Sequence, residues 1–506
     1  MATRVSNYAQ QTNSLQNIFR VTEDLFKTQQ QISSGKRITK PSDDPAGIRD
    51  ALALRTSIAK SNQFVRNVNN NRIYFQAGES TLDSVNINLI RAKELAVQEL
   101  GGLATAETRK FAVSELNQLI SQTLDSANIK VKNQFIFAGT AFRTQPFEQS
   151  ASGAVYLGNS ERHEIGVGSN TNEEFTHTGS DTFGNDLNPK ITKNTKLVSL
   201  NAGSGITPGS FNITDRAGTS GTVTVTSTDT VSDLISKINN LNGNVTASIN
   251  ANGSGLQLTD ESSVISQALT VEEISGGNTA LALGILGKRD GNISGLDLNP
   301  VVTSSTLISD LKNGEGLTLN QIGIVNGASS GTVTLSSATT ISDVIDLINK
   351  SSFNVIASIN SSSNSLLVNS KNSSTVAIVK NVGTDETAED LGLGSGKNVF
   401  TTLFKLRDAL NSNDSIAILA SMENLGSNQV SINNNRAILG AKFSGVETKI
   451  DFHDQNKLNI LEQLSNIEDV DAVKSISDLA NLEFALQATL SATAKVLQPT
   501  LLDFLR

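Results

Sequence analysis

Few side chains of this 506-residue chain have types suited to catalysis or metal binding. It contains no cysteine, which excludes disulfide scaffolds, thiolate metal sites and thiol nucleophiles. Its three histidines are His163, His177 and His453. His163 lies in a charged, strand-like segment with no second imidazole at ligand spacing, so a solvated strand face is expected there. His453, between Asp451 and Asp454, is expected on a charged helix surface.

Two short segments near the N-terminus could serve phosphate or metal chemistry. Residues 32–38 bring Ser, Gly and Lys together, but the spacing differs from a P-loop and no strand precedes it. Asp43 and Asp44 could ligate a metal, yet capping of a helix with Pro45 at its first position accounts for both carboxylates. We also find no nucleophile elbow, H-E-x-x-H or dinucleotide fingerprint. The residues therefore predict a non-enzyme without metal or cofactor.

The charge balance and hydropathy bear on the partners and the location. A net charge of −9 provides no general basic field for nucleic acid or an anionic membrane. No stretch of about 18 apolar residues is present, so no membrane insertion is expected. The polar N-terminus lacks the apolar region of a cleavable signal, which favours the cytoplasm unless export uses an uncleaved signal.

Long helices are expected at both ends of the chain. Near the N-terminus, apolar or neutral residues step by three and four at Leu15, Ile18, Thr22, Leu25, Gln29 and Ile32. Gly35 would end this helix, and a helical hairpin would turn near Gly101. Near the C-terminus the same spacing occurs at Ala472, Ile476, Leu479, Glu483, Leu486, Leu490, Thr493 and Leu497. Such narrow stripes cannot bury themselves, so we expect the ends to pair with each other or with neighbouring subunits. A purely intramolecular coiled coil is the alternative.

The middle of the chain contains a duplication. Residues 186–189 (Asp-Leu-Asn-Pro) recur as 297–300, and residues 221–225 recur as 331–335 with one change. Each copy predicts a strand followed by a capped helix and two further strands, a small α+β unit. The expected caps are Thr230 or Ser232 in the first copy and Thr340 or Ser342 in the second.

Residues 31–38 and 41–47 together resemble the N-terminal signature of the bacterial flagellin superfamily. Within it, a filament subunit and the subunit that joins hook to filament are the two candidates. Residues 133–140 and 467–471 are similar to the junction subunit, as are 146–147, 156–159 and 501–505, whereas the final Arg506 is flagellin-like. The two middle copies resemble the IN motif of filament proteins, which does not discriminate between the two.

The resemblance and the patterns together imply an α+β fold, with coiled-coil domains from both termini and inserted β-rich modules. The expected domains are a terminal coiled coil of 1–44 with 457–506, a helical core with a β-hairpin of 45–185 with 399–456, and IN-like modules at 186–296 and 297–398.

The resemblance implies a structural subunit of the flagellum that connects hook to filament, exported by the type III apparatus and located outside the cell. Its implied partners are flagellin, the first hook-associated protein, a ring of its own copies and an export chaperone on the C-terminal stripe. The filament subunit is one alternative, and an adhesin-like surface protein that works through the modules is another. The expected assembly residues are Leu15, Ile18, Leu25, Ile32, Ile476, Leu479, Leu486, Leu490 and Leu497.

Overall fold

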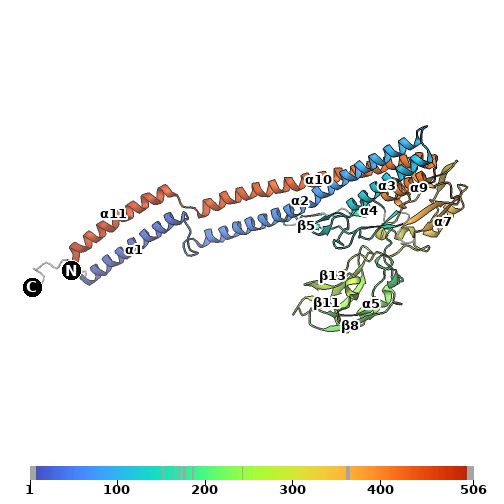
Figure 1. Cartoon of the computed structure of the whole chain (residues 1–506). Helices are drawn as coiled ribbons and strands as arrows, with labels where there is room; N and C mark the ends of the chain where they lie inside the picture. Colours follow the sequence, from blue (N-terminus) through green and yellow to red (C-terminus); the bar gives the residue numbers. More distant parts are fainter. Residues whose placement is uncertain are drawn as a thin grey trace, which may run out of the picture. The chain divides into compact units, whose positions relative to one another are not determined.

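A computed structural model describes residues 7–150, 153–162, 164–168, 171–174, 178–184, 187–241, 243–360 and 365–497. The chain divides into two compact units (Figure 1). Unit 1 consists of residues 1–70, 166–171 and 445–506, and unit 2 consists of residues 71–165 and 172–444. The long helices α2 and α10 each contribute residues to both units.

Unit 1 is helical and combines the two ends of the chain. Its elements are α1 (Asn7–Ser34), the first part of α2 (Pro45–Leu100), the last part of α10 (Ser415–Glu468) and α11 (Ala472–Leu497). Helix α1 packs along α11. Gly35 follows α1 with a φ of +71°, a conformation that glycine adopts without a steric cost. The backbone N–H of Gly47 donates to Asp44 Oδ1 at 2.9 Å, so the predicted cap of α2 is confirmed.

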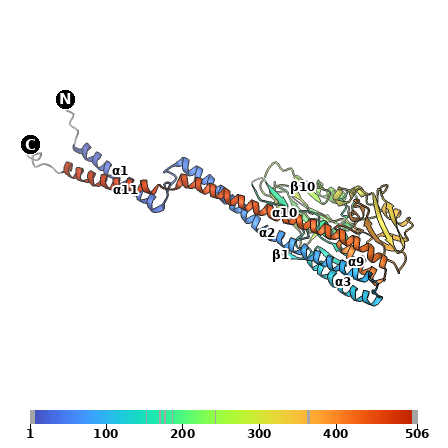
Figure 2. The same ribbon diagram turned by 90° about the horizontal axis from the view of Figure 1, so that it is seen from above.

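Unit 2 contains a layer of helices made by the rest of α2, by α3 (Ala106–Ala127), by α9 (Val399–Asn411) and by the rest of α10, seen side by side in Figure 2. Helices α2 and α3 turn at Gly101, as predicted, and Thr105 caps α3. The faces that meet are lined by buried apolar side chains such as Leu89 and Leu116. This burial holds the layer together.

Short strands follow α3. They are β1 (Lys130–Val131), β2 (Gln134–Phe135), β3 (Phe147–Ser150), β4 (Gly153–Tyr156), β5 (Glu164–Gly166) and β6 (Asn172–Glu174), followed by α4 (Gly179–Thr182). They pair antiparallel as β1 with β2 and β3 with β4, while β5 pairs with β6. Phe147 lies 5.6 Å from Phe183 and 5.2 Å from Phe400 between ring centroids, so aromatic packing joins this region to α9.

The first module has two small sheets around one core. Its elements are η1 (Leu197–Ser199), η2 (Asn201–Gly203), β7 (Gly209–Thr214), β8 (Ser220–Val225), α5 (Val231–Asn239), β9 (Val245–Ile249), β10 (Leu256–Asp260), β11 (Leu269–Glu273), α6 (Thr279–Ala282), β12 (Gly287–Arg289) and β13 (Ile293–Ser294). The sheets have the orders β12-β11-β7-β8 and β13-β10-β9. Val231, Leu234 and Ile238 of α5 are buried in the core, and Ile235 is partly buried, so these four residues form the apolar face of the helix.

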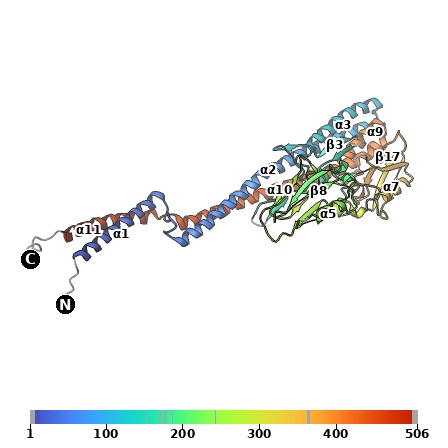
Figure 3. The same ribbon diagram turned by 90° about the horizontal axis from the view of Figure 1, so that it is seen from below.

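The second module repeats this plan with fewer strands (Figure 3). Its elements are η3 (Ile308–Asp310), η4 (Lys312–Gly314), β14 (Gln321–Asn326), β15 (Ser329–Thr334), α7 (Ile341–Asn349), β16 (Val355–Ile359), β17 (Leu366–Ser370), β18 (Ile378–Asn381) and α8 (Thr387–Asp390). The sheets have the orders β15-β14-β18 and β16-β17.

Equivalent threonines cap the module helices. Thr230 and Thr340 each accept a hydrogen bond from the backbone N–H three residues on, and Asp233 and Asp343 complete the capping boxes. Backbone N–H groups of Thr339 and Thr340 lower the pKa of Asp343 to about 2, with the Thr339 contact contributing most. Of the two predicted caps in each copy, the threonine is the one used.

Among the described residues, no helix is both long and apolar enough to span a bilayer.

Candidate functional site

The two ends of the chain are joined by backbone hydrogen bonds within unit 1. The N–H of Arg37 donates to the carbonyl of Glu468 at 2.6 Å, and the N–H of Val470 donates to the carbonyl of Gly35 at 3.1 Å. Gly35 and Arg37 lie in the short break between α1 and α2, Glu468 is the last residue of α10, and Val470 lies in the break between α10 and α11. We call this contact the joint. It brings together segment 31–38, which carries part of the family resemblance, and segment 467–471, which resembles the junction subunit.

A buried carboxylate lies at the centre of the joint. Glu468 is 3% exposed and accepts hydrogen bonds from Lys36 Nζ at 2.6 Å and from Arg55 at 2.8 Å. Burial alone would raise the pKa of Glu468, but the hydrogen bonds and positive charges of Lys36 and Arg55 outweigh it and hold the pKa below its ordinary value. One side chain therefore ties α10 to both the α1–α2 connection and α2.

The two aspartates before α2 have separate structural roles. Asp44 caps α2 and also accepts a hydrogen bond from Arg37 at 3.2 Å. Asp43 instead accepts hydrogen bonds from the N–H groups of Thr39 and Lys40, which lower its pKa to about 2, the Lys40 contact contributing most. The expectation that helix capping explains both carboxylates is wrong for Asp43, which closes a turn. Among the described residues no carboxylate and histidine cluster could hold a metal ion.

The predicted assembly residues fall into two groups. Ile18, Leu25, Ile32, Leu479 and Leu486 are buried or half-buried, whereas Leu15, Ile476 and Leu490 are 49%, 58% and 49% exposed. Leu497 is the last residue of α11, and its side chain lies outside the described residues.

The face of α11 turned toward α1 is displaced from the stripe that the sequence predicts. Apart from Ala485, its least exposed residues are Ser475, Leu479, Leu482, Leu486, Thr489 and Thr493. They step by four and three, as in a coiled coil. Leu479, Leu486 and Thr493 belong to the predicted stripe, whereas Ser475 and Thr489 lie in the seam in place of their larger neighbours Ile476 and Leu490. Small residues permit close approach, so the larger apolar neighbours remain outside the seam.

Large apolar side chains that sequence reasoning missed are exposed on the same two helices. Phe19 and Phe26 of α1 are 70% and 64% exposed, and Val473 and Phe484 of α11 are 83% and 75% exposed. Exposed apolar groups that gather on one element mark interaction surfaces. On α1 the spacing in the sequence could have indicated this second face, because Leu15, Phe19, Thr22 and Phe26 are separated by four, three and four residues.

His453 is not the surface residue that its acidic neighbours suggested. It is 8% exposed, its Nε2 lies 2.9 Å from the carbonyl of Val167, and its ring lies 5.3 Å from that of Phe64. Asp451 and Asp454 are exposed. His453 is therefore a packing residue of unit 1. His163 and His177 lie outside the described residues.

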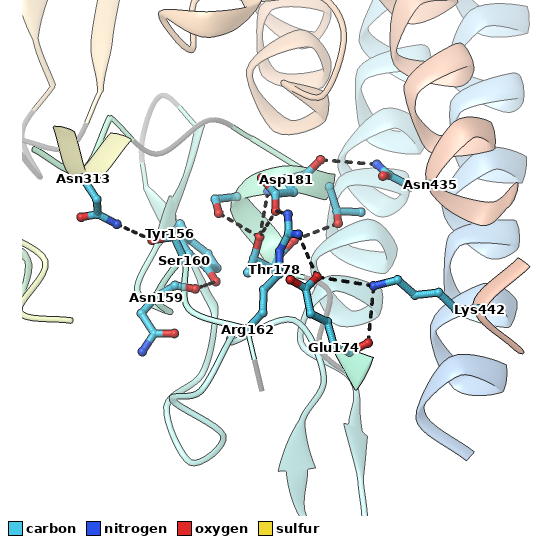
Figure 4. A network of polar contacts seen from close by, with 12 residues as sticks. Tyr156, Asn159, Ser160, Arg162, Glu174, Thr178, Asp181, Asn313, Asn435 and Lys442 are labelled. Atoms are coloured by element: carbon cyan, nitrogen blue, oxygen red, sulfur yellow. Dashed lines mark hydrogen bonds and ion pairs between the residues drawn. The ribbon is translucent and has the colours of Figure 1, made fainter. Parts of the chain in front are cut away.

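Unit 2 contains a polar cleft of about 830 Å³. Arg162 on its wall donates to Glu174 at 3.0 Å and to Asp181 at 3.1 Å, and Lys442 contacts Glu174, as Figure 4 shows. Burial would raise the pKa of Asp181, but hydrogen bonds from Thr178 and Arg162 outweigh it and lower the pKa. Each of these charges has a partner in the fold, so the cleft favours a structural role over catalysis.

The terminal regions match family models of known proteins. Residues 5–141 match the bacterial flagellin N-terminal helical region, and residues 422–505 match the bacterial flagellin C-terminal helical region. Residues 210–262, in the first module, match the flagellin hook IN motif. The first two matches include the segments that form the joint.

The similarity to individual proteins extends over only part of this chain and part of each relative. The chain is 27% identical over 183 residues to flagellar hook-associated protein 3 of Salmonella typhimurium, covering 36% of this chain and 56% of that protein. It is 28% identical over 163 residues to flagellar hook-associated protein 3 of Escherichia coli, covering 32% and 50%. It is also 32% identical over 96 residues to the flagellar filament 33 kDa core protein of Treponema phagedenis, covering 19% and 34%.

The chain thus spans about half the length of its hook-associated relatives. Both flagellin terminal regions and the IN motif are nevertheless present, and α1 of the N-terminal region packs along α11 of the C-terminal region. The chain belongs to the bacterial flagellin superfamily.

Proposed function

We propose that this chain is a structural subunit of the bacterial flagellum that joins the hook to the filament. The observation that carries the choice is the similarity to two proteins named flagellar hook-associated protein 3. The paired terminal helices support an assembling subunit, because they combine a closed joint with exposed apolar side chains. The paired charges of the unit 2 cleft support a role other than catalysis.

The exposed residues of α1 and α11 form the proposed assembly surface. It comprises Leu15, Phe19, Phe26, Val473, Ile476, Phe484 and Leu490. Burying a large apolar side chain contributes about 1.5–3 kcal/mol. Several such contacts per copy would stabilise a ring of subunits.

The buried and half-buried residues of the two helices have a different role in this proposal. Leu25 and Leu486 pack on the sides of α1 and α11 that face each other, so they order the helix pair before it docks. Isolated helices of this length gain most of their stability from such packing. Ile18, Ile32 and Leu479 act in the same way.

The proposed partners follow from the family. They are flagellin on one side, the first hook-associated protein on the other, further copies of this chain and an export chaperone that binds α11. Export through the flagellar type III apparatus would place the protein outside the cell.

Flagellin itself is the second candidate function. The similarity to a filament core protein of Treponema phagedenis favours it. The two functions differ in the copy number and in the phenotype of a deletion. We expect deletion of a junction subunit to leave hooks without filaments and to release flagellin into the medium, whereas deletion of the filament subunit should release no flagellin.

Charge substitutions test the assembly surface. We expect Phe26→Glu and Phe484→Glu to be exported but absent from isolated hook–filament structures, because a carboxylate cannot be buried without a partner. Gln487→Glu, at an exposed polar position of α11, is the matched control and should be incorporated. Normal incorporation of both phenylalanine variants would contradict the proposed surface.

A further inference from the structure

The two modules share one plan, so their sheet edges can be compared residue by residue. Strand β10 pairs with β9 through Leu258 and Ala247, and β17 pairs with β16 through Val368 and Ala357. Leu258 and Val368 are therefore equivalent. By the same reasoning Val271 of β11 and Val379 of β18 are equivalent, because Val271 pairs with Ile213 of β7 and Val379 pairs with Ile324 of β14.

In the first module these edges are covered by the module's own chain. Leu258 pairs with Ile293 of β13, and Val271 pairs with Gly287 of β12. Both strands come directly after α6. Strands of the module itself therefore cover these two positions, and β12 and β13 become the edges of its sheets.

In the second module helices replace the missing strands. After α8, the described chain continues into α9 and α10 instead of two further strands. Lys405 of α9 donates through Nζ to the carbonyl of Val368 at 2.7 Å. Asn424 of α10 donates through Nδ2 to the carbonyl of Val379 at 2.9 Å. These are the two strand positions that β13 and β12 cover in the first module.

Further contacts attach the second module to the same helices. Asn428 donates to the carbonyl of Gly396 at 2.6 Å, and Asp414 accepts from the N–H of Val376 at 3.0 Å. Burial lowers the pKa of Lys405 to about 8, which reflects how closely the module covers α9. Polar groups of the second module and of the helices therefore find their hydrogen-bond partners in each other.

The connections show that the first module is inserted into the second. Leu298, at the end of the first module, is buried in that module's own core, and its carbonyl accepts from Asn201. Leu187, the equivalent residue ahead of the first module, is buried in the core of the second, and its carbonyl accepts from Lys312. The second module is consequently built from two pieces of chain that flank the first.

Entry and exit of the insert lie in one buried network. Asn188 Nδ2 is 2.9 Å from Asp297 Oδ2 and 3.1 Å from Asn299 Oδ1. Asp297 also accepts from Ser160 at 3.3 Å and is 7% exposed. Figure 4 shows Ser160 beside Asn313, which belongs to the second module.

We propose that the two duplicated modules have different structural roles. The second module is an integral part of the body formed with helices α9 and α10, whereas the first is a separable domain inserted into the second. The first module is then the part of the chain that can be removed or exchanged without disturbing the helices. This inference does not depend on which flagellar structure the chain builds.

Excision of residues 189–299 from the full chain tests the proposal. It joins Asn188 to Pro300 and so restores the Asp-Leu-Asn-Pro sequence already present there. We expect amides of α9 and of α10 up to Ser444 to keep their hydrogen-exchange protection within about threefold, as for a remote change. A loss of tenfold or more in α9 would overturn the separability of the first module.

A matched pair of substitutions tests the second half of the proposal without deleting chain. Ile238 of α5 and Ile348 of α7 are equivalent and both fully buried. We expect Ile348→Ala to lower amide protection in α9 by on the order of 30-fold, because cavities of this size weaken the whole cooperative unit. Ile238→Ala should lower protection only within residues 197–298. Equal effects of the two variants on α9, or no effect of Ile348→Ala there, would contradict the proposal.

Removing the hydrogen bonds that Lys405 and Asn424 donate to the second module is a less disruptive test, which applies if Ile348→Ala does not fold. Lys405→Met and Asn424→Leu keep the apolar volume but leave the carbonyls of Val368 and Val379 without these donors. We expect exchange in β17 and β18 to accelerate and exchange in β10 and β11 to stay unchanged. Unchanged exchange in β17 and β18 would refute the role of these two donors.

Discussion

Replacing Glu468 by glutamine is expected to loosen the joint between the chain ends. The carboxylate accepts from Lys36 and Arg55, and it is buried while the side chains of Lys36 and Arg55 are 41% and 53% exposed. A hydrogen bond to a charged group contributes about 1.5–3 kcal/mol, and an exposed ion pair about 0–1 kcal/mol. Since the two cations regain water but the buried acceptor loses its charge, we expect a cost of about 2 kcal/mol.

Hydrogen exchange at the joint measures this cost locally. The N–H groups of Arg37 and Val470 bridge the chain ends, so their protection reports on opening of the joint. A cost of about 2 kcal/mol corresponds to a loss of protection of about 30-fold. The control is Asp469→Asn, because Asp469 is exposed and lies 3.8 Å from Lys36. Its effect should stay below about threefold. Equal effects of the two variants, or unchanged protection in Glu468→Gln, would refute the reasoning.

The same carboxylate gives the joint a pH dependence. The pKa of Glu468 is lower in the folded protein than in the unfolded chain, so the ionised form stabilises the fold. This stability is fully present above the unfolded pKa of about 4.3 and is lost as the pH falls through the folded pKa. Protection at Arg37 should therefore decline below about pH 4 in the parent and decline less in Glu468→Gln, where Asp43 and Asp44 are the neighbouring carboxylates with lowered pKa values.

Three further substitutions test single structural roles. Gly35→Ala should destabilise the joint by about 1 kcal/mol because an alanine at positive φ is strained, and unchanged exchange at Val470 would contradict this. Thr340→Ala should destabilise α7 by about 1 kcal/mol through loss of its cap, whereas Ser342→Ala should have little effect; comparable losses of α7 protection would speak against the threonine as the cap. His453→Ala should destabilise unit 1 by about 2 kcal/mol through the cavity and the lost contact with Val167, and a heat-unfolding temperature equal to that of the parent would rule this out.

Local features were predictable because neighbouring residues determine them. The cap at Asp44, the turn at Gly35 and the capping threonines of the modules depend on a few residues in sequence, and the structure has them where the sequence predicted. The duplication was also evident, because equal segments recur at nearly constant spacing. These features are enough to predict the α+β fold with helical ends.

Long-range partners were not predictable from one sequence. Lys36 and Glu468 are 432 residues apart, and no local pattern indicates that they meet. His453 was placed on the surface because its neighbours are charged, but burial depends on which side of α10 faces α2 and residue 167. The seam of α11 was displaced for a similar reason. Hydrophobicity favours Ile476, while the geometry of close packing selects Ser475.

The position of the chain along the flagellum tests the central proposal most directly. Antibody against the modules, applied to intact flagella and viewed by electron microscopy with gold label, locates every assembled copy. The proposed junction function predicts label confined to the point where hook meets filament, and none along the filament. Label along the whole filament would contradict it and favour the filament subunit.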